Sequence, residues 1–75
     1  MNELGEALYQ AEMAKLEAER IECIAILKVY FHKPVGIGEH PDLITEIDKY
    51  VDRLANATDK IEALRANFKI FETGQ

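Results

Sequence analysis

Apolar residues recur every three or four positions in both halves of the chain, a spacing that places side chains on one face of an α-helix. The stripe in the first half, interrupted only by a charged Arg20, consists of Tyr9, Met13, Leu16, Arg20, Cys23, Leu27 and Tyr30. The stripe in the second half consists of Ile47, Val51, Leu54, Ala57, Ile61, Leu64, Phe68 and Phe71. Two successive steps of three, from Val51 to Leu54 to Ala57, predict a local phase shift of the second stripe. The pattern predicts an all-α fold.

The predicted helices cover about residues 2–31 and about 41–71, and a turn covers about 32–40. Pro41 favours a helix start, because its missing N–H costs nothing at the first helical position, and His40 then becomes the N-cap. Pro34 disfavours helical geometry in the residue before it. The two helices have matching lengths, so we expect a single domain built as an antiparallel two-helix hairpin.

Residues 21–31 are apolar around most of the helix circumference, since only Glu22 and Lys28 are charged. One neighbouring helix covers only one face of such a segment. The predicted hairpin core consists of Leu16, Cys23, Ile24, Leu27, Phe31, Ile47, Val51, Leu54, Ile61, Leu64 and Phe68. The predicted dimer interface consists of Ile21, Ala25, Ile26 and Val29. We therefore expect a homodimer in the form of a four-helix bundle. The alternatives are a hairpin that covers this patch with its own turn and a different protein bound to the same patch.

The length of the chain also favours self-association. It has 75 residues, and a single core in a chain of this size seldom supplies more than about 3–5 kcal/mol. Its one cysteine cannot form a disulfide within the chain and suits a reducing compartment. The start lacks the layout of a signal peptide, and the longest uninterrupted apolar run, residues 23–27, is far short of a membrane span. We expect a cytoplasmic protein that does not enter a membrane.

The charge balance excludes one class of partner. The formal net charge is −5, and the nine basic residues are scattered along the chain. Proteins bind a nucleic-acid backbone chiefly through clustered Lys and Arg. We therefore expect no binding to nucleic acid, and surface acids that keep the protein soluble.

No residue pattern points to catalysis. The chain contains no serine, and Cys23 lies in the most apolar stretch, where thiols are usually buried and unreactive. We expect no enzymatic activity, no cofactor and a structural role for Cys23.

Two imidazoles and two carboxylates gather around the predicted turn, namely His32, Glu39, His40 and Asp42. Such groups can bind Zn²⁺. Their spacing matches no recurring metal motif, and the chain has no Glu-x-x-His pair of the kind found in dimetal bundles. Capping and turn formation are the expected roles, and a metal-binding protein that uses these histidines remains an alternative.

The segment from Pro34 through Gly36, Gly38 and Pro41 to Lys49 resembles small uncharacterised helical-hairpin proteins that are encoded by tailed phages and found in marine viral metagenomes. The resemblance covers about the central third of the chain. It implies a virus-encoded accessory protein that works in a bacterial host cytoplasm, and it implies no active site.

The function expected from these features is that of a non-enzymatic, homo-oligomeric module for protein–protein contact, with a phage accessory or assembly factor as one form of it. One alternative is an acidic regulator that binds a host or viral nucleic-acid enzyme. The other is metal binding at the turn.

Overall fold

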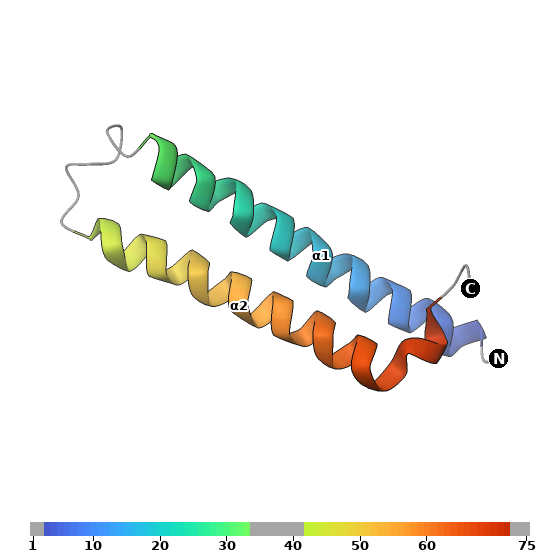
Figure 1. The fold of residues 1–75 in the computed structure, drawn as a ribbon. Helices are drawn as coiled ribbons and strands as arrows, with labels where there is room; N and C mark the ends of the chain where they lie inside the picture. The colour runs from blue at the N-terminus through green and yellow to red at the C-terminus, as the bar shows by residue number, and fades with distance from the viewer. Residues whose placement is uncertain (1–2, 34–41, 73–75) are drawn as a thin grey trace.

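A computed structural model describes residues 3–33 and 42–72. Helix α1 covers Glu3–His32, helix α2 covers Leu43–Phe68, and a short 3₁₀ helix, η2, covers Lys69–Phe71. The two long helices lie side by side and run in opposite directions (Figure 1), in a molecule that measures 54 × 17 × 16 Å. The described part of the chain contains no strand, so the prediction of an all-α hairpin is confirmed.

Helix α1 forms where the sequence is rich in strong helix formers, mainly Ala, Glu, Leu and Lys. Glu3 and Glu6 lie in its first turn, where the positive end of the helix dipole favours carboxylates. At the other end, the Nδ1 atom of His32 lies 2.9 Å from the carbonyl oxygen of Lys28. The observed bounds differ from the predicted ones by one residue at each end.

Helix α2 begins at Leu43, about two residues later than predicted. Asp42 is non-helical, with φ −99° and ψ 19°, and its side chain makes no capping hydrogen bond. Its carbonyl oxygen accepts a hydrogen bond from the backbone N–H of Glu46 at 3.0 Å. The predicted roles of His40 and Pro41 fall outside the described residues.

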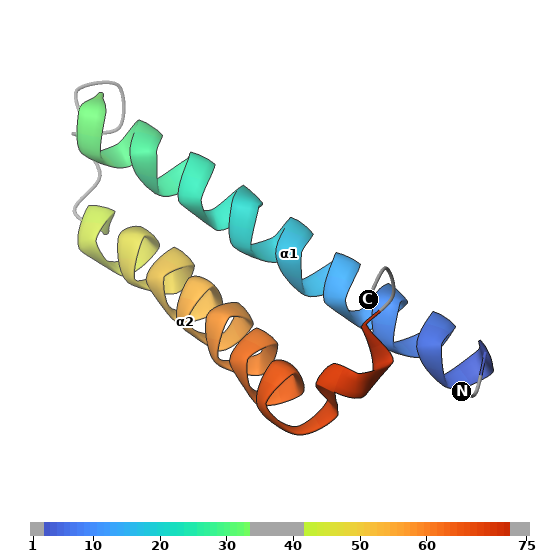
Figure 2. The same ribbon diagram turned by 45° about the vertical axis from the view of Figure 1, so that its right-hand side comes forward.

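Helix α2 ends at Phe68, so the prediction that it continues to residue 71 is wrong. The backbone bends at Phe68, where φ is −134° and ψ is 24°. The bend brings the chain back towards α1 (Figure 2), where the rings of Phe71 and Tyr9 lie 6.4 Å apart. The hydroxyl of Tyr9 also donates a hydrogen bond to Oε2 of Glu72 at 3.2 Å. These contacts with α1 make the bent ending more stable than a continuation of α2 as an α-helix for three more residues.

The core between α1 and α2 consists of one stripe from each helix. The buried apolar residues are Tyr9, Met13, Leu16, Cys23, Leu27, Ala57 and Ile61. The α2 stripe has a regular alternation of four- and three-residue steps through Leu43, Ile47, Tyr50, Leu54, Ala57, Ile61 and Leu64. Tyr50 occupies the stripe position that was assigned to Val51, and its ring lies 6.1 Å from that of Tyr30. The predicted phase shift is therefore wrong.

Three residues predicted for the hairpin core are exposed in the single chain. Phe31 is 62% exposed, Val51 is 43% exposed and Phe68 is 49% exposed. Phe31 and Val51 each follow a stripe tyrosine by one residue, so the helical rotation of about 100° per residue carries both to the flank of the core. Phe68 lies at the bend that ends α2.

The other predicted core residues lie between the helices to different degrees. Those that are buried are Leu16, Cys23, Leu27 and Ile61. Those that are half-buried are Ile24, Ile47, Leu54 and Leu64.

Candidate interaction surface

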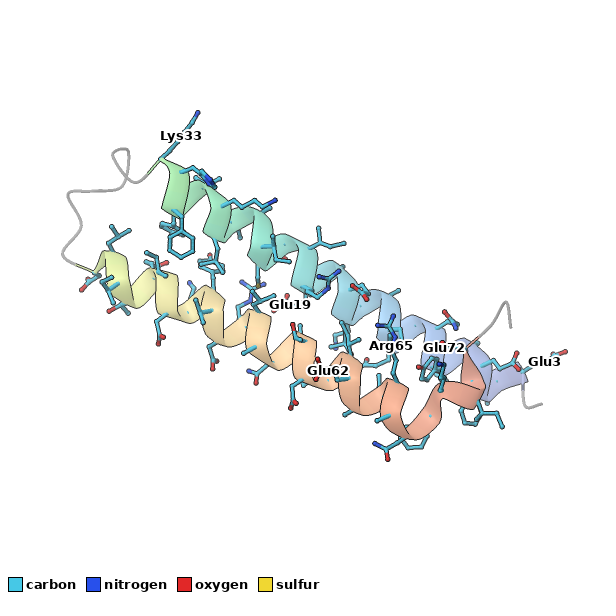
Figure 3. All side chains as sticks on the ribbon, viewed as in Figure 1. Glu3, Glu19, Lys33, Glu62, Arg65 and Glu72 are labelled. Atoms are coloured by element: carbon cyan, nitrogen blue, oxygen red, sulfur yellow. The ribbon has the colours of Figure 1, made fainter. Side chains whose placement is uncertain are left out.

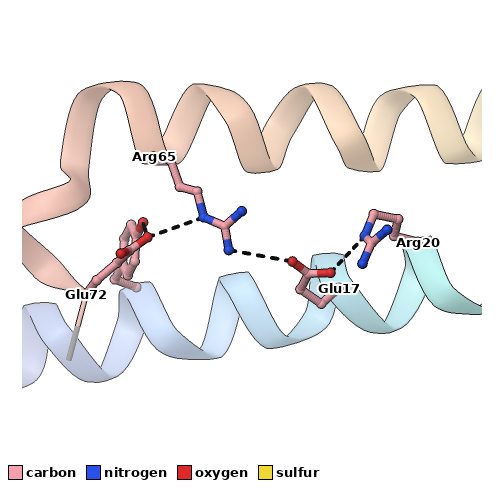
Figure 4. A network of polar contacts seen from close by, with 5 residues as sticks. Glu17, Arg20, Arg65 and Glu72 are labelled. Carbon is pink, nitrogen blue, oxygen red and sulfur yellow. Dashed lines mark hydrogen bonds and ion pairs between the residues drawn. The ribbon is translucent and has the colours of Figure 1, made fainter. Parts of the chain in front are cut away.

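Ion pairs between the helices identify the two long edges of the hairpin. On one edge, Arg53 contacts Glu19 through two hydrogen bonds of 2.7 and 2.8 Å. On the other edge, a guanidinium nitrogen of Arg65 lies 3.7 Å from a carboxylate oxygen of Glu17 (Figure 4). These pairs show which flank of α1 adjoins which flank of α2.

The edge that carries Arg53 is charged. It is formed by residues that immediately precede stripe positions, namely Glu12, Glu19, Ile26, Glu46, Arg53 and Lys60. The hydrogen bonds from Arg53 lower the pKa of Glu19. Because this pKa is lower in the folded chain than in the unfolded chain, the contact stabilises the fold at neutral pH. This stabilisation is lost as the pH falls through the lowered pKa of Glu19.

The edge that carries Arg65 changes character along its length. It is formed by residues that immediately follow stripe positions at seven-residue spacing. On α1 these are Gln10, Glu17, Ile24 and Phe31, and on α2 they are Ile44, Val51, Thr58 and Arg65. The half nearer Glu3 is polar and the half nearer Lys33 is apolar. We call the apolar half, consisting of Ile24, Phe31, Ile44 and Val51, the apolar edge.

The apolar edge exposes large side chains. Phe31 and Val51 are exposed as described above, Ile44 is 74% exposed, and Ile24 is half-buried. Flanking positions of a two-helix core are usually charged, because water covers them. Apolar residues in this row indicate a surface that another molecule covers.

The polar half of the same edge is occupied by contacts within the chain. Tyr9, Arg65 and Glu72 line a groove of about 320 Å³. Glu72 accepts hydrogen bonds from the hydroxyl of Tyr9 and from Nε of Arg65, at 3.2 and 3.3 Å, and Glu17 bridges Arg65 to Arg20 (Figure 4). Burial and the neighbouring Glu72 raise the pKa of Tyr9 and keep its hydroxyl protonated as a donor. The cluster holds the end of the chain against α1.

The four residues predicted for the dimer interface do not lie on one surface. Ile21 and Val29 are 59% and 56% exposed, Ala25 is also exposed, and Ile26 is half-buried. Ala25 and Val29 are each two residues from the buried Leu27, about 200° around the helix, so they face away from α2. Ile26 belongs to the charged edge. Only Ile21, three residues before Ile24, borders the apolar edge.

The α2 side of the apolar edge was missed by the prediction. Ile44 was assigned no role, and Val51 was assigned to the core. The available signal was the seven-residue spacing from Ile44 through Val51 and Thr58 to Arg65, which marks one flank of α2. Its pairing with the matching flank of α1 becomes visible only through the Glu17–Arg65 contact.

Cys23 lies in the core with no exposed surface, as a free thiol. Burial raises the pKa of this thiol and keeps it in the unreactive, protonated form. Its placement fits a structural role.

The predicted metal-ligating residues can be placed only in part. Glu39 and His40 fall outside the described residues. Asp42 precedes α2, and His32 contacts the carbonyl oxygen of Lys28 at the end of α1. Within residues 3–33 and 42–72, no three His, Cys, Asp or Glu side chains are grouped so that they could hold a metal ion.

Neither described helix is both long enough and apolar enough to cross a lipid bilayer. The most distinctive surface feature of the described helices is the apolar edge. Comparison of the chain with models of protein families, with curated proteins and with solved structures gives no match.

Proposed function

We propose that this chain is a non-enzymatic helical module that acts by protein–protein contact, and that its first partner is a second copy of itself. The observation that carries the proposal is the apolar edge. In the described chain, nine large apolar residues are exposed whereas seven apolar residues are buried. Burying one large apolar side chain contributes about 1.5–3 kcal/mol, so a partner that covers several of them gains enough to offset much of the entropy lost on association.

The accessible area of the chain also supports a partner. It is 5627 Å², whereas a compact monomer of 8.5 kDa is expected to expose roughly 4,700 Å². The excess follows from the elongated shape, 54 × 17 × 16 Å, and a partner that lies along its length covers part of this surface. A second copy offers the same edge, so one symmetric contact covers both surfaces. Two hairpins joined in this way form a four-helix bundle.

The biological role that follows is assembly or scaffolding rather than chemistry. If the resemblance to phage-encoded hairpins holds, the dimer is a viral accessory or assembly factor in a bacterial cytoplasm. An acidic regulator of a nucleic-acid enzyme has less support, because Glu19 on the charged edge already pairs with Arg53 of the same chain. Metal binding at the turn gains no support from the described residues.

Sedimentation equilibrium at micromolar concentrations tests the proposal. The expected result is a mass of twice 8.5 kDa that decreases towards the monomer mass on dilution. A single species of 8.5 kDa at every concentration would contradict self-association. If the chain is a monomer alone but forms a complex with a heterologous protein, the contact function survives with a different partner.

A further inference from the structure

We infer that the second copy docks on the apolar edge with both copies of Lys33 at one end of the dimer and both copies of Glu3 at the other. The two-fold axis then runs along the length of the hairpin. The inference rests on the proposed self-association and adds the orientation of the partner. Lys33 and Glu3 lie at opposite ends of α1 (Figure 3), which makes the orientation measurable.

The symmetry determines which helices meet. A two-fold rotation about the long axis leaves every residue at its own level along that axis. It places α1 of one copy against α2 of the second copy, so the α1 row of the edge faces the α2 row. Neighbouring helices remain antiparallel throughout the bundle, as in the hairpin itself.

The register within the hairpin then determines which side chains meet. Glu17 and Arg65 lie at the same level, since they form an ion pair at 3.7 Å. Two seven-residue steps from each of them towards the Lys33 end reach Phe31 and Val51. In the proposed dimer, Phe31 of one copy therefore faces Val51 of the second copy, at about the same level along the bundle.

The same symmetry places opposite charges together in the polar half. Glu17 of one copy faces Arg65 of the second copy, and Arg65 faces Glu17. Phe31 thus meets Val51 and Glu17 meets Arg65, and between these two levels the same register places Ile24 opposite Thr58. This complementarity favours a second copy in this one orientation.

A two-fold axis perpendicular to the hairpin fits the edge less well. It places α1 against α1 with the ends reversed. When the copies overlap fully, Phe31 faces the polar half of the row, near Gln10 of the second copy. When the copies slide so that the apolar halves meet, the half that carries Glu17 and Arg65 is left without a partner across the interface, and only about half of the edge is buried.

Distances between nitroxide spin labels in the dimer test the orientation. The two variants, prepared separately, are Glu3→Cys and Lys33→Cys, both at exposed helix ends where substitution leaves the core intact. In the unmutated chain the single cysteine, Cys23, has no exposed surface and is expected to take no label. Dilution of labelled chains with excess unlabelled chains is expected to remove the dipolar signal, which shows that the measured distance joins two copies.

The proposed orientation predicts that both variants give distances within about 30 Å, because helices in a bundle lie ~8–10 Å apart and like residues share a level. A fully overlapped dimer with reversed ends would give label-to-label distances of about 40 Å or more in both variants, since α1 rises ~1.5 Å per residue. That result would overturn the proposed orientation. A reversed dimer in which only the apolar halves overlap would give a short distance for Lys33→Cys and a distance beyond about 60 Å for Glu3→Cys. That result would also overturn the proposed orientation. A dimeric mass with either reversed pattern defeats only the orientation, whereas a monomeric mass with no dipolar signal defeats the proposed function as well.

Discussion

Leu16→Ala is expected to lower the free energy of unfolding by about 2–5 kcal/mol, because it removes a buried side chain and leaves a cavity between the helices. Leu16 is 5% exposed and belongs to the cluster formed by Tyr9, Met13 and Ile61. A single core in a chain of this size seldom supplies more than about 3–5 kcal/mol, so the loss brings the hairpin close to unfolding at ambient temperature. Urea denaturation followed by circular dichroism measures the change.

Leu8→Ala is the matched control. Leu8 lies on the same helix and is the same residue type, but it is 62% exposed. Its truncation is expected to change the unfolding free energy by no more than ~0.5 kcal/mol. Equal losses in the two variants would show that the buried stripe of α1 does not hold the helices together.

Phe31→Glu is expected to raise the dissociation constant of the dimer by about 10²- to 10⁴-fold. The change removes an apolar contact of roughly 1.5–3 kcal/mol, and two-fold symmetry makes it act twice. Helix content is expected to stay the same, since Phe31 is exposed near the end of α1 in the single chain. Sedimentation equilibrium gives the dissociation constant, and circular dichroism gives the helix content.

Val29→Glu separates the apolar edge from the far face of α1. Val29 is 56% exposed, close to the 62% of Phe31, but it faces away from α2. The dissociation constant of the Val29→Glu dimer is expected to change by about threefold or less, as for a surface position outside the interface. If Val29→Glu weakens the dimer as much as Phe31→Glu does, the apolar edge is not the specific interface.

The two helices could be predicted because each carries a stripe of apolar residues at helical spacing. The assignment of core residues within α2 failed at Val51, because Val51 and its neighbour Tyr50 could both fill the same position of the stripe. Tyr50 and Val51 are both apolar enough for the core, and the regular four–three alternation selects Tyr50. Counting the steps from Leu43 would have found the regular stripe without a structure.

The end of α2 could not be predicted from local sequence. Residues 69–71 are compatible with a continuing helix, and the bend is favoured by contacts of Phe71 and Glu72 with Tyr9, more than sixty positions away in the chain. Such a contact depends on the register of α1 against α2, which periodicity alone does not provide.

The candidate surface was predicted in part. Excess apolar residues on α1 indicated that one neighbouring helix is not enough, but the predicted interface used α1 alone. The apolar edge joins α1 to α2, and its α2 member Val51 comes level with Phe31 only when the facing flanks are known. The Glu17–Arg65 ion pair supplies that information.

Isotope-filtered nuclear Overhauser spectroscopy on a mixture of ¹³C-labelled and unlabelled chains tests most directly whether a second copy covers the apolar edge. Filtering selects contacts between copies and removes those within a chain. We predict cross-peaks between the ring of Phe31 in one copy and the methyl groups of Val51 in the other. Intermolecular cross-peaks that involve Val29 but neither Phe31 nor Val51, or no intermolecular cross-peaks at all, would contradict the account.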